Sequence, residues 1–262
     1  MLSKSIRSLK IIAHGFGKAK PCNEDIVQMP NISSIAAGED SYFVKGNKFG
    51  IADGIGAWRE SKGYGSSAFV SGKLLHYCCS LDDNNIINLL NKAYQQTLQD
   101  MYKHNIKGST TVLLGQLLNN TLHICNLGDC QLLIYRKNQL VFKSEDKYHF
   151  FNCPFQLGTN SINTPNDAQH VKFPVEIGDV FVLGSDGLFD NLWEEDIHEI
   201  ILKNKKDYKK CAHALVHDAM NISTDPSYDE SPFQLKASEE GLYHIGGKLD
   251  DTTAIVGEVV EK

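Results

Sequence analysis

Short apolar runs recur along the chain at the length and spacing of β-strands. They are rich in β-branched and aromatic residues and are separated by glycine, asparagine and charged residues, which favours strands over helices. The pairs Asn119-Asn120 and Lys137-Asn138 each separate two neighbouring runs and predict tight hairpin turns. The predicted strands lie at 9–13, 41–44, 49–52, 110–118, 122–126, 132–135, 140–143, 180–183 and 253–259.

Helical spacing of apolar residues occurs in two pairs of longer segments. Residues 66–79 and 84–104 predict two helices between the early strands, and residues 194–203 and 208–220 predict two more before the last strand. Strands and helices therefore follow one another in blocks. This order favours an α+β fold of antiparallel sheets with helices packed outside, and not a doubly wound parallel sheet.

The segment 145–178 shows little regular pattern, and we expect a surface excursion there. Its phenylalanines Phe150, Phe151 and Phe155 are expected to anchor this excursion in the core. The chain of 262 residues contains neither internal repeats nor low-complexity segments. We therefore expect one domain over residues 9–262, preceded by a tail at 1–8.

Charge and cysteine content narrow the class of protein. Asp and Glu number 32 against 26 Lys and Arg, a formal net charge of −6, so we expect no general affinity for nucleic acid or anionic membranes. No apolar run approaches the roughly 20 residues that span a bilayer. The seven cysteines form no C-x-x-C pair, which is typical of a reduced, intracellular protein.

The first twenty residues carry five bases and no acid precedes Glu24. This bias is compatible with a mitochondrial presequence. It is equally compatible with a short tail that leads into the strand at 9–13, and we favour the tail because few residues precede that strand.

Two aspartates, Asp186 and Asp190, follow the buried apolar run 180–183 in the segment VFVLGSDGLFDNLW. A carboxylate near a core is destabilising unless a positive group meets it. No lysine or arginine lies near these aspartates in the sequence, since the first basic side chain after Lys172 is His198. The sequence alone therefore leaves the compensating charge unassigned.

Acids occupy the ends of other apolar runs as well. Taken singly, each is adequately explained by a turn, because Asp-Gly is a common turn pair. If they converge, each pair about 5 Å apart repels by roughly 3 kcal/mol at an effective dielectric of 20, and bound cations would have to offset this. The additional candidates are Glu39, Asp40, Asp53, Asp129, Asp250 and Asp251.

The chemistry of such a site follows from its donors. All are oxygen ligands, with neither histidine nor cysteine in the same turns except Cys130 beside Asp129, which favours Mg²⁺ or Mn²⁺ over Zn²⁺. Two such ions clamp a phosphate and lower the pKa of a shared water. The pattern therefore indicates hydrolysis of a phosphate ester.

An ordered series of motifs runs nearly from end to end: GFGK, GEDSYF, ADGIGAW, GSTT, NLGDC, HFFNCPFQLG, SDGLFDN, DPSYDESPF and GGKLDDTTAIV. In this series the chain resembles the metal-dependent protein serine/threonine phosphatases, the protein phosphatase 2C group. It looks closest to the mitochondrial and plastid branch linked to coenzyme Q biosynthesis. The resemblance implies a four-layer αββα sandwich, with two antiparallel sheets flanked by helix pairs and a two-metal centre at the sheet ends.

The resemblance also implies roles for individual residues. Asp53 matches the aspartate that bridges two Mg²⁺ or Mn²⁺ ions, and Gly54 matches the glycine whose carbonyl binds the first ion. Asp186 and Asp250 match the carboxylates on the second ion. The pair Glu39 and Asp40 matches the acids that hold metal-bound water, and Asp129 and Asp190 match positions that, with Asp186, hold a weaker third ion.

Two features depart from the family pattern. Ile55 stands where many members have a histidine that acts as general acid, although close relatives also have an aliphatic residue there. The arginine that grips the substrate phosphate has no clear counterpart, and Lys18 or Lys20 could replace it as a point charge.

The resulting hypothesis is a Mg²⁺- or Mn²⁺-dependent phosphatase that hydrolyses phosphoserine and phosphothreonine by direct attack of a metal-bridging water. Asp53, Asp186 and Asp250 act through that water, and Lys18 is the candidate substrate-binding residue. The alternative is a weakly catalytic scaffold that binds phosphoproteins. We expect a monomer in the mitochondrion or, alternatively, the cytoplasm. A two-metal nuclease is disfavoured by the negative net charge and by the lack of a basic stripe.

Overall fold

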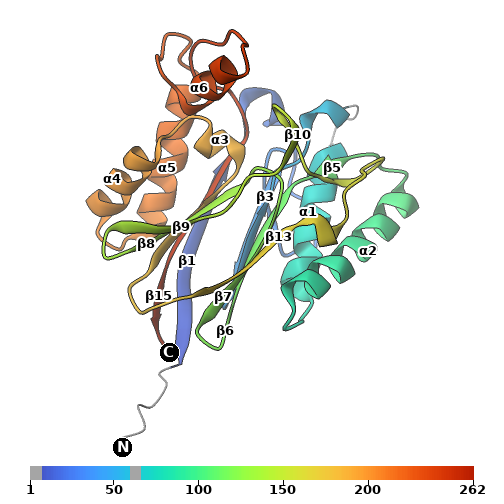
Figure 1. Cartoon of the computed structure of the whole chain (residues 1–262). Coiled ribbons are helices and arrows are strands. Elements are labelled where there is room, and N and C mark those ends of the chain that lie inside the picture. Colours follow the sequence, from blue (N-terminus) through green and yellow to red (C-terminus); the bar gives the residue numbers. More distant parts are fainter. Residues whose placement is uncertain (1–7, 60–65) are drawn as a thin grey trace, which may run out of the picture.

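Two antiparallel β-sheets face each other at the centre of the molecule (Figure 1). The computed structural model describes residues 8–59 and 66–262. The first sheet has the strand order β1 (Leu9–Lys18), β15 (Thr252–Glu261), β14 (Val180–Gly184), β8 (Gln131–Arg136) and β9 (Gln139–Lys143). The second has the order β13 (Gln169–Pro174), β7 (Thr121–Leu127), β6 (Val112–Leu118), β4 (Lys48–Ala52), β3 (Asp40–Lys45) and β2 (Ile35–Ala37).

Helices cover the outer face of each sheet. The helices α4 (Glu194–Asn204) and α5 (Tyr208–Ser223) lie on the first sheet, and α1 (Ser66–Ser80) and α2 (Ile86–His104) lie on the second (Figure 1). The predicted four-layer sandwich is confirmed. Two short helices, α3 (Asp186–Phe189) and α6 (Pro232–Glu239), were not among the predicted elements.

The core between the sheets is apolar because alternate residues of each strand point inward. Phe49 of β4 and Phe181 of β14 stack across the interface, with ring centroids 4.6 Å apart and ring planes 12° from parallel. Both rings are buried together with inward-facing aliphatic residues such as Ile51 and Leu183. This packing holds the two sheets together.

The two predicted hairpin turns are confirmed. Asn119 and Asn120 have φ angles of 48° and 60°, and Lys137 and Asn138 have φ angles of 51° and 63°. Positive φ at both central residues matches the twist of the flanking strands. The turns join β6 to β7 and β8 to β9.

The segment 145–178 is more regular than predicted. It contains β13, which pairs with β7 at the edge of the second sheet, and the small strands β10 (Tyr148–Phe150), β11 (Cys153–Pro154) and β12 (Leu157–Gly158). Strand β13 was missed because only its alternate residues are shielded and its other residues are exposed. The expectation that Phe150 anchors this segment in the core is wrong, since 70% of Phe150 is exposed.

The predicted run 110–118 is divided at Thr111. Ser109 and Thr110 form β5, which pairs with β12, and the remainder forms β6. In the described part of the chain, 3₁₀ turns lie at Pro21–Asn23, Gly56–Trp58 and Pro165–Asp167. Because of this division, β6 belongs to the second sheet while β5 pairs with β12 of the segment 145–178.

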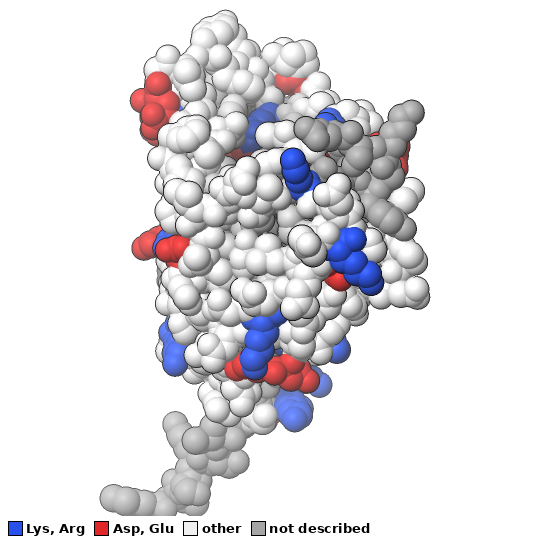
Figure 2. Space-filling view, turned by 90° about the vertical axis from the view of Figure 1, so that its right-hand side faces the viewer, with Lys and Arg blue, Asp and Glu red and all other residues white. Residues whose placement is uncertain are grey.

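Charged side chains are interspersed on the surface. On the face in Figure 2, lysine and arginine alternate with aspartate and glutamate over a mainly uncharged background. Within the described residues, no helix has the length and apolar character needed to cross a membrane. The predicted tail at 1–8 lies outside the described residues except for Ser8.

Candidate metal centre

A cavity of about 630 Å³ opens where strands of both sheets end. Asp53 and Gly54 follow β4, Asp186 follows β14, and Asp250 precedes β15; all four line the cavity. Segments separated by up to about two hundred residues thus bring these oxygen donors together. The convergence that the sequence could only suggest is present in the fold.

Backbone hydrogen bonds fix the position of Asp53. Its N–H donates to Thr111 Oγ1 at 3.1 Å, and its carbonyl accepts from Thr111 N at 2.9 Å and from Thr110 Oγ1 at 2.8 Å. The next residue, Gly54, lies against Glu39 and Ser67 so closely that a Cβ would come within 2.7 Å of the Glu39 carbonyl oxygen. Glycine is therefore required where the chain turns into the cavity.

The Asp53 carboxylate itself makes no hydrogen bond or ion pair with a described residue, although it is largely enclosed. Burial raises its pKa well above the usual range, and the neighbouring Asp186 and Asp40 raise it further. Burial and Asp186 raise the pKa of Asp129 in the same way. Both carboxylates are thus short of positive charge.

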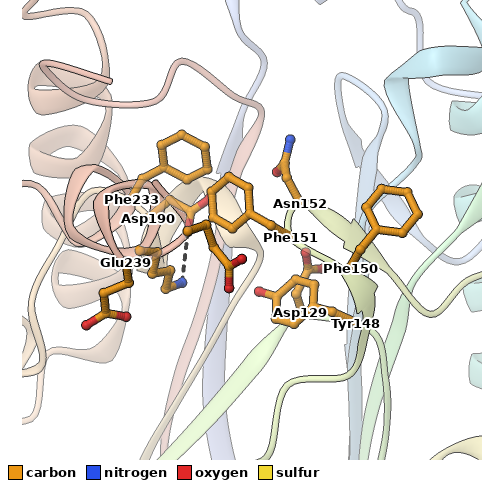
Figure 3. A pocket seen from close by; sticks show the side chains of 10 residues that line it. Asp129, Tyr148, Phe150, Phe151, Asn152, Asp190, Phe233 and Glu239 are labelled. Atoms are coloured by element: carbon orange, nitrogen blue, oxygen red, sulfur yellow. Dashed lines mark hydrogen bonds and ion pairs between the residues drawn. The ribbon is translucent and has the colours of Figure 1, made fainter. Parts of the chain in front are cut away.

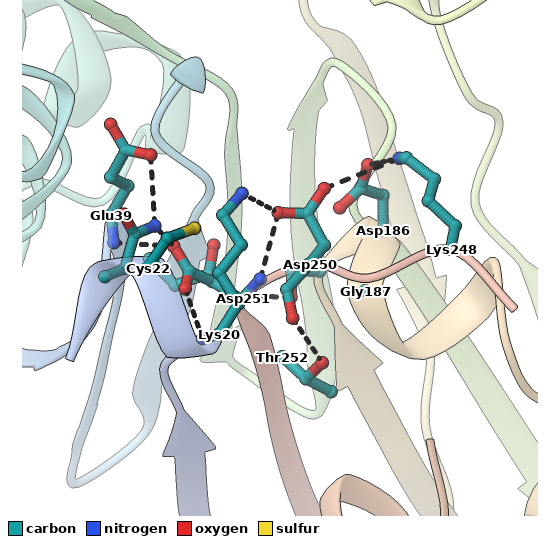
Figure 4. Close-up of polar contacts among 12 residues, drawn as sticks. Lys20, Cys22, Glu39, Asp186, Gly187, Lys248, Asp250, Asp251 and Thr252 are labelled. Carbon is teal, nitrogen blue, oxygen red and sulfur yellow. Dashed lines mark hydrogen bonds and ion pairs between the residues drawn. The ribbon is translucent and has the colours of Figure 1, made fainter. Parts of the chain in front are cut away.

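Lysine supplies the positive charge at Asp186 and Asp190 that the sequence left unassigned. Lys248 Nζ lies 2.5 Å from Asp186 Oδ2 (Figure 4). It also lies 2.8 Å from Asp190 Oδ2. It is also 3.6 Å from Asp250 Oδ2. Lys236 Nζ lies 3.0 Å from Asp190 Oδ1. Both lysines come from remote segments, so sequence proximity could not reveal them.

The pKa values of Asp186 and Asp190 are shifted in opposite directions from the usual value. Burial alone would raise the pKa of Asp190, but Lys248 and Lys236 lower it below its usual value. The pKa of Asp186 remains raised because burial outweighs the effect of Lys248. Asp190 is therefore the more firmly ionised of the two.

Asp250 is bound by a second lysine. Lys20 Nζ lies 2.6 Å from Asp250 Oδ1, and the Lys20 N–H donates to Asp251 Oδ1 at 2.8 Å (Figure 4). Asp251 Oδ2 accepts from Asn23 Nδ2 at 2.6 Å and from the Glu39 N–H at 2.8 Å. Asp250 lines the cavity, whereas Asp251 is buried and ties three chain segments together.

The acidic pair Glu39 and Asp40 is held from both sides. Glu39 Oε2 accepts from Asn23 Nδ2 and from Arg59 Nη2, each at 3.1 Å. Asp40 Oδ2 accepts from Ser185 Oγ at 2.7 Å and from Thr253 Oγ1 at 2.8 Å. Neither acid is among the residues that line the cavity, so both lie behind its wall.

The donor set fits divalent cations. Asp40 Oδ1, Asp129 Oδ1 and Asp186 Oδ1 are buried without a hydrogen-bond partner in the described part of the chain. Over residues 8–59 and 66–262, no three His, Cys, Asp or Glu side chains are already gathered as a complete ligand cluster. Mg²⁺ commonly takes one or two carboxylates and keeps its waters. The unpaired oxygens around this cavity suit that mode of binding.

The structure places Lys20, and not Lys18, in the cavity wall. Lys18 pairs with Thr252 at the end of β1 and is exposed, whereas Lys20 lines the cavity near Asp250. Ile55 also lines it, and no described lining residue is a histidine. The wall includes further residues that the sequence did not single out, namely Trp58, Asn152 and Gln156.

A second cavity of about 410 Å³ adjoins the first and shares Asp129, Phe150 and Asn152 with it. Its aromatic wall joins the segment 145–178 to α6, because the ring centroids of Phe151 and Phe233 lie 5.5 Å apart (Figure 3). Glu239 and Glu240 add acidic groups at this cavity. Two segments far apart in the sequence thus form one surface beside the acidic site.

Comparisons with known proteins were consistent with this geometry. The family described as Stage II sporulation protein E (SpoIIE) matches residues 66–229. The "Protein phosphatase PTC7 homolog" of Danio rerio is 30% identical over 97% of this chain and 91% of its own length. The Homo sapiens protein of the same name is 32% identical over 86% of this chain and 80% of its own length.

Solved structures share the fold. The photosystem II phosphatase PBCP has a TM-score of 0.80 and 28% identity, and the similarity covers 95% of this chain and 98% of PBCP. The catalytic domain of the serine/threonine phosphatase PstP, solved in complex with two manganese ions, has a TM-score of 0.65 and 18% identity. That similarity covers 97% of this chain and all of the PstP chain.

Proposed function

This chain belongs to the protein phosphatase 2C family, and we propose that it hydrolyses phosphoserine and phosphothreonine in proteins with the help of Mg²⁺ or Mn²⁺. One observation carries the proposal: Asp53, Asp186 and Asp250 line one cavity, and the Asp53 carboxylate lacks any hydrogen bond to a described residue. The two manganese ions of the related PstP fold support the choice of metal.

We assign the ligands as follows. Asp53 would hold both ions, the Gly54 carbonyl would hold the first, and Asp186 and Asp250 would hold the second. Glu39 and Asp40 would act through water, because they lie behind the cavity wall. When bound, such a pair of ions supplies a nucleophilic water of lowered pKa and neutralises the charge of the phosphate.

The chain itself positions the phosphate. Lys20 replaces Lys18 in this role, since its ammonium lies in the cavity wall. Asp250 holds that ammonium and keeps it charged: burial by itself lowers the pKa of Lys20, but the contact with Asp250 raises it above its usual value. Lys20 therefore presents a permanent positive charge to an anionic group in the cavity.

The protein substrate would contact the second cavity. Phe151 and Phe233 offer an apolar surface beside the site, and Glu239 and Glu240 favour positively charged neighbours of the phosphorylated residue. We assign the specificity of the phosphatase to this surface. The resemblance to the mitochondrial and plastid branch of the family favours a mitochondrial location, with the cytoplasm as the alternative. We expect a monomer.

A weakly catalytic phosphoprotein-binding scaffold is the second candidate. Ile55 lines the cavity where a general acid would stand, so the leaving group lacks an adjacent imidazole. The two candidates differ in turnover, because a scaffold binds a phosphopeptide without hydrolysing it.

Steady-state assays of p-nitrophenyl phosphate and a phosphoserine peptide test the proposal. Multiple turnovers that require Mn²⁺ and disappear with a chelator would support the phosphatase. Binding of the peptide without release of phosphate at any Mn²⁺ concentration would favour the scaffold. A thiol reagent should leave turnover intact, because the proposed chemistry uses no cysteine nucleophile.

A further inference from the structure

Both oxygens of Asp190 are occupied by lysines of this chain. Asp190 Oδ1 contacts Lys236 Nζ at 3.0 Å, and Asp190 Oδ2 contacts Lys248 Nζ at 2.8 Å. The Asp190 side chain is only 6% exposed and that of Lys248 only 15%. Asp190 therefore differs from Asp129, whose buried Oδ1 is unpaired among the described residues.

The position of Lys248 is built into the fold. Its backbone N–H donates to Asn191 Oδ1 and its carbonyl accepts from Asn191 Nδ2, both at 2.9 Å. Asn191 is fully buried, directly after Asp190. The Lys248 ammonium also lies 5.0 Å from the centre of the Phe233 ring, a favourable cation–π contact. Contacts with the Asn191 side chain, the Asp190 carboxylate and the Phe233 ring thus fix the position of the Lys248 ammonium.

The two lysines that contact Asp190 together carry the charge of one divalent ion. The resemblance to the family assigned a weak third ion to Asp129, Asp186 and Asp190. Two protonated lysines carry the same total charge as one Mg²⁺ or Mn²⁺ ion, and they contact two of those three carboxylates. Asp190 has an ammonium within 3.0 Å of each of its two oxygens, whereas Asp250 has one this close only at Oδ1, since Lys248 Nζ lies 3.6 Å from Asp250 Oδ2. The residues present therefore do not fit an additional cation at Asp190.

We propose that Lys236 and Lys248 together take the place of the third ion, so that this phosphatase binds two divalent ions and not three. Asp190 is then a positioning residue that holds Lys248 beside Asp186 and Asp250, and it is not a metal ligand. This inference rests on the two-ion centre proposed above, but it concerns the chain's own cations.

The location and number of bound ions test the inference without an activity assay. Crystals of the wild-type protein are soaked in millimolar Mn²⁺ after chelation, and the ions are placed by anomalous scattering. We expect two ions near Asp53, Asp186 and Asp250 and none at Asp190. An ion bound to Asp190 would overturn the inference and leave the phosphatase proposal intact, whereas an empty centre would overturn both.

Titration calorimetry of variants provides a second measurement. Asp190→Asn should still bind two ions, whereas loss of one ion would make Asp190 a ligand and contradict the inference. The double variant K236M/K248M should gain a weak third site at Asp129, Asp186 and Asp190. Lys203→Met, an exposed lysine that pairs with Glu199, is the matched control and should leave the number of ions unchanged.

The double variant leaves carboxylates without their partners, so its folding is checked by circular dichroism with and without Mn²⁺. A folded double variant that still binds only two ions would contradict the proposal that Lys236 and Lys248 take the place of the third ion. The wild-type and Asp190→Asn measurements do not depend on that variant, so the inference stays open to refutation if it fails to fold.

Discussion

The Lys248 ammonium lies 2.5 Å from the Asp186 carboxylate, across 62 residues of sequence. The contact gives Asp186 a partner at Oδ2 while its buried Oδ1 remains unpaired among the described residues. One oxygen is thus held by the chain and the other is available to a cation. The Lys248 ammonium offsets part of the repulsion among the acids that line the cavity, so the fold can be stable before any ion is bound.

Replacing Asp53 should abolish turnover without unfolding the protein. We expect Asp53→Asn to lower kcat for p-nitrophenyl phosphate by roughly 10²-fold or more, because the cavity loses the acid assigned to both ions. The metal-free variant should melt no lower than the wild type, since an acid whose ionisation is disfavoured by burial and by Asp186 is replaced by a neutral amide. Stopped assays with Mn²⁺ and thermal melts measure the two effects.

Glu199→Gln is the matched control for Asp53→Asn. Glu199 is an exposed acid on α4 that pairs only with Lys203 within the described chain, so its neutralisation should leave kcat unchanged. Full activity of folded Asp53→Asn would refute the assignment of this aspartate.

Divalent cations should stabilise the folded protein. Ligands that bind only the native state add stability by mass action, about 2.7 kcal/mol at a concentration one hundred times Kd. We therefore expect Mn²⁺ to raise the Tm of chelated wild-type protein and to have a much smaller effect on Asp53→Asn. Scanning calorimetry over a range of Mn²⁺ concentrations measures this, and an equal rise in both proteins would place the ions elsewhere.

The stability of the metal-free protein should fall between pH 4 and pH 7 partly because of Asp146. Burial raises the pKa of Asp146 to about 6, although Lys236 opposes this. A carboxyl whose pKa is raised by folding contributes stability at low pH, and the contribution is lost as the pH rises through the folded value. Asp146→Asn should remove this loss and stabilise the protein at pH 7 by roughly 2 kcal/mol.

The Asp146→Asn variant keeps an acceptor for Gln131 Nε2, which donates to Asp146 Oδ2 at 2.8 Å in the wild type. Urea unfolding at pH 5 and pH 7 therefore isolates the effect of charge. A stability difference between variant and wild type that does not change with pH would contradict the raised pKa.

Substitution of Phe233 should affect protein substrates more than small ones. We expect Phe233→Ala to lower kcat/KM for a phosphoserine peptide about tenfold, because an apolar contact with a neighbouring side chain is lost. The same variant should change kcat/KM for p-nitrophenyl phosphate little, because the contacts with Asn191 and Asp190 still hold Lys248 in place. Leu235→Ala, on the same helix but outside the cavity lining, is the control; equal losses for both substrates would exclude a specificity role.

Loosening the contact between the sheets should cost stability but spare the chemistry. Phe181→Leu removes part of the ring that stacks on Phe49 at 4.6 Å, and we expect a loss of about 1–2 kcal/mol. Tyr102→Ala, at a side chain that is 91% exposed, should be nearly neutral. Urea unfolding measures both changes, and activity at low temperature should remain near the wild-type level in each variant.

The periodicity of the sequence determined most of the elements and their block order. Strand β14 is a short continuous apolar run and helix α2 repeats its apolar residues at helical spacing, so the type of each element was recognisable locally. The turns Asn119-Asn120 and Lys137-Asn138 were equally recognisable, because few residues tolerate positive φ at two successive positions. Strand β13 was not predicted, because an edge strand that is only half shielded shows a weak alternation of apolar and polar residues.

The acids of the site were visible in the sequence as a set of residue types, and the tertiary structure decided their partners. Asp53, Asp186 and Asp250 line the same cavity only because β4, β14 and β15 end on one side of two facing sheets. The pairing of Lys248 and Lys236 with Asp190 depends on where two remote segments fold back. Charge interactions fall off with distance in space and not with separation along the chain, so sequence order could not predict them.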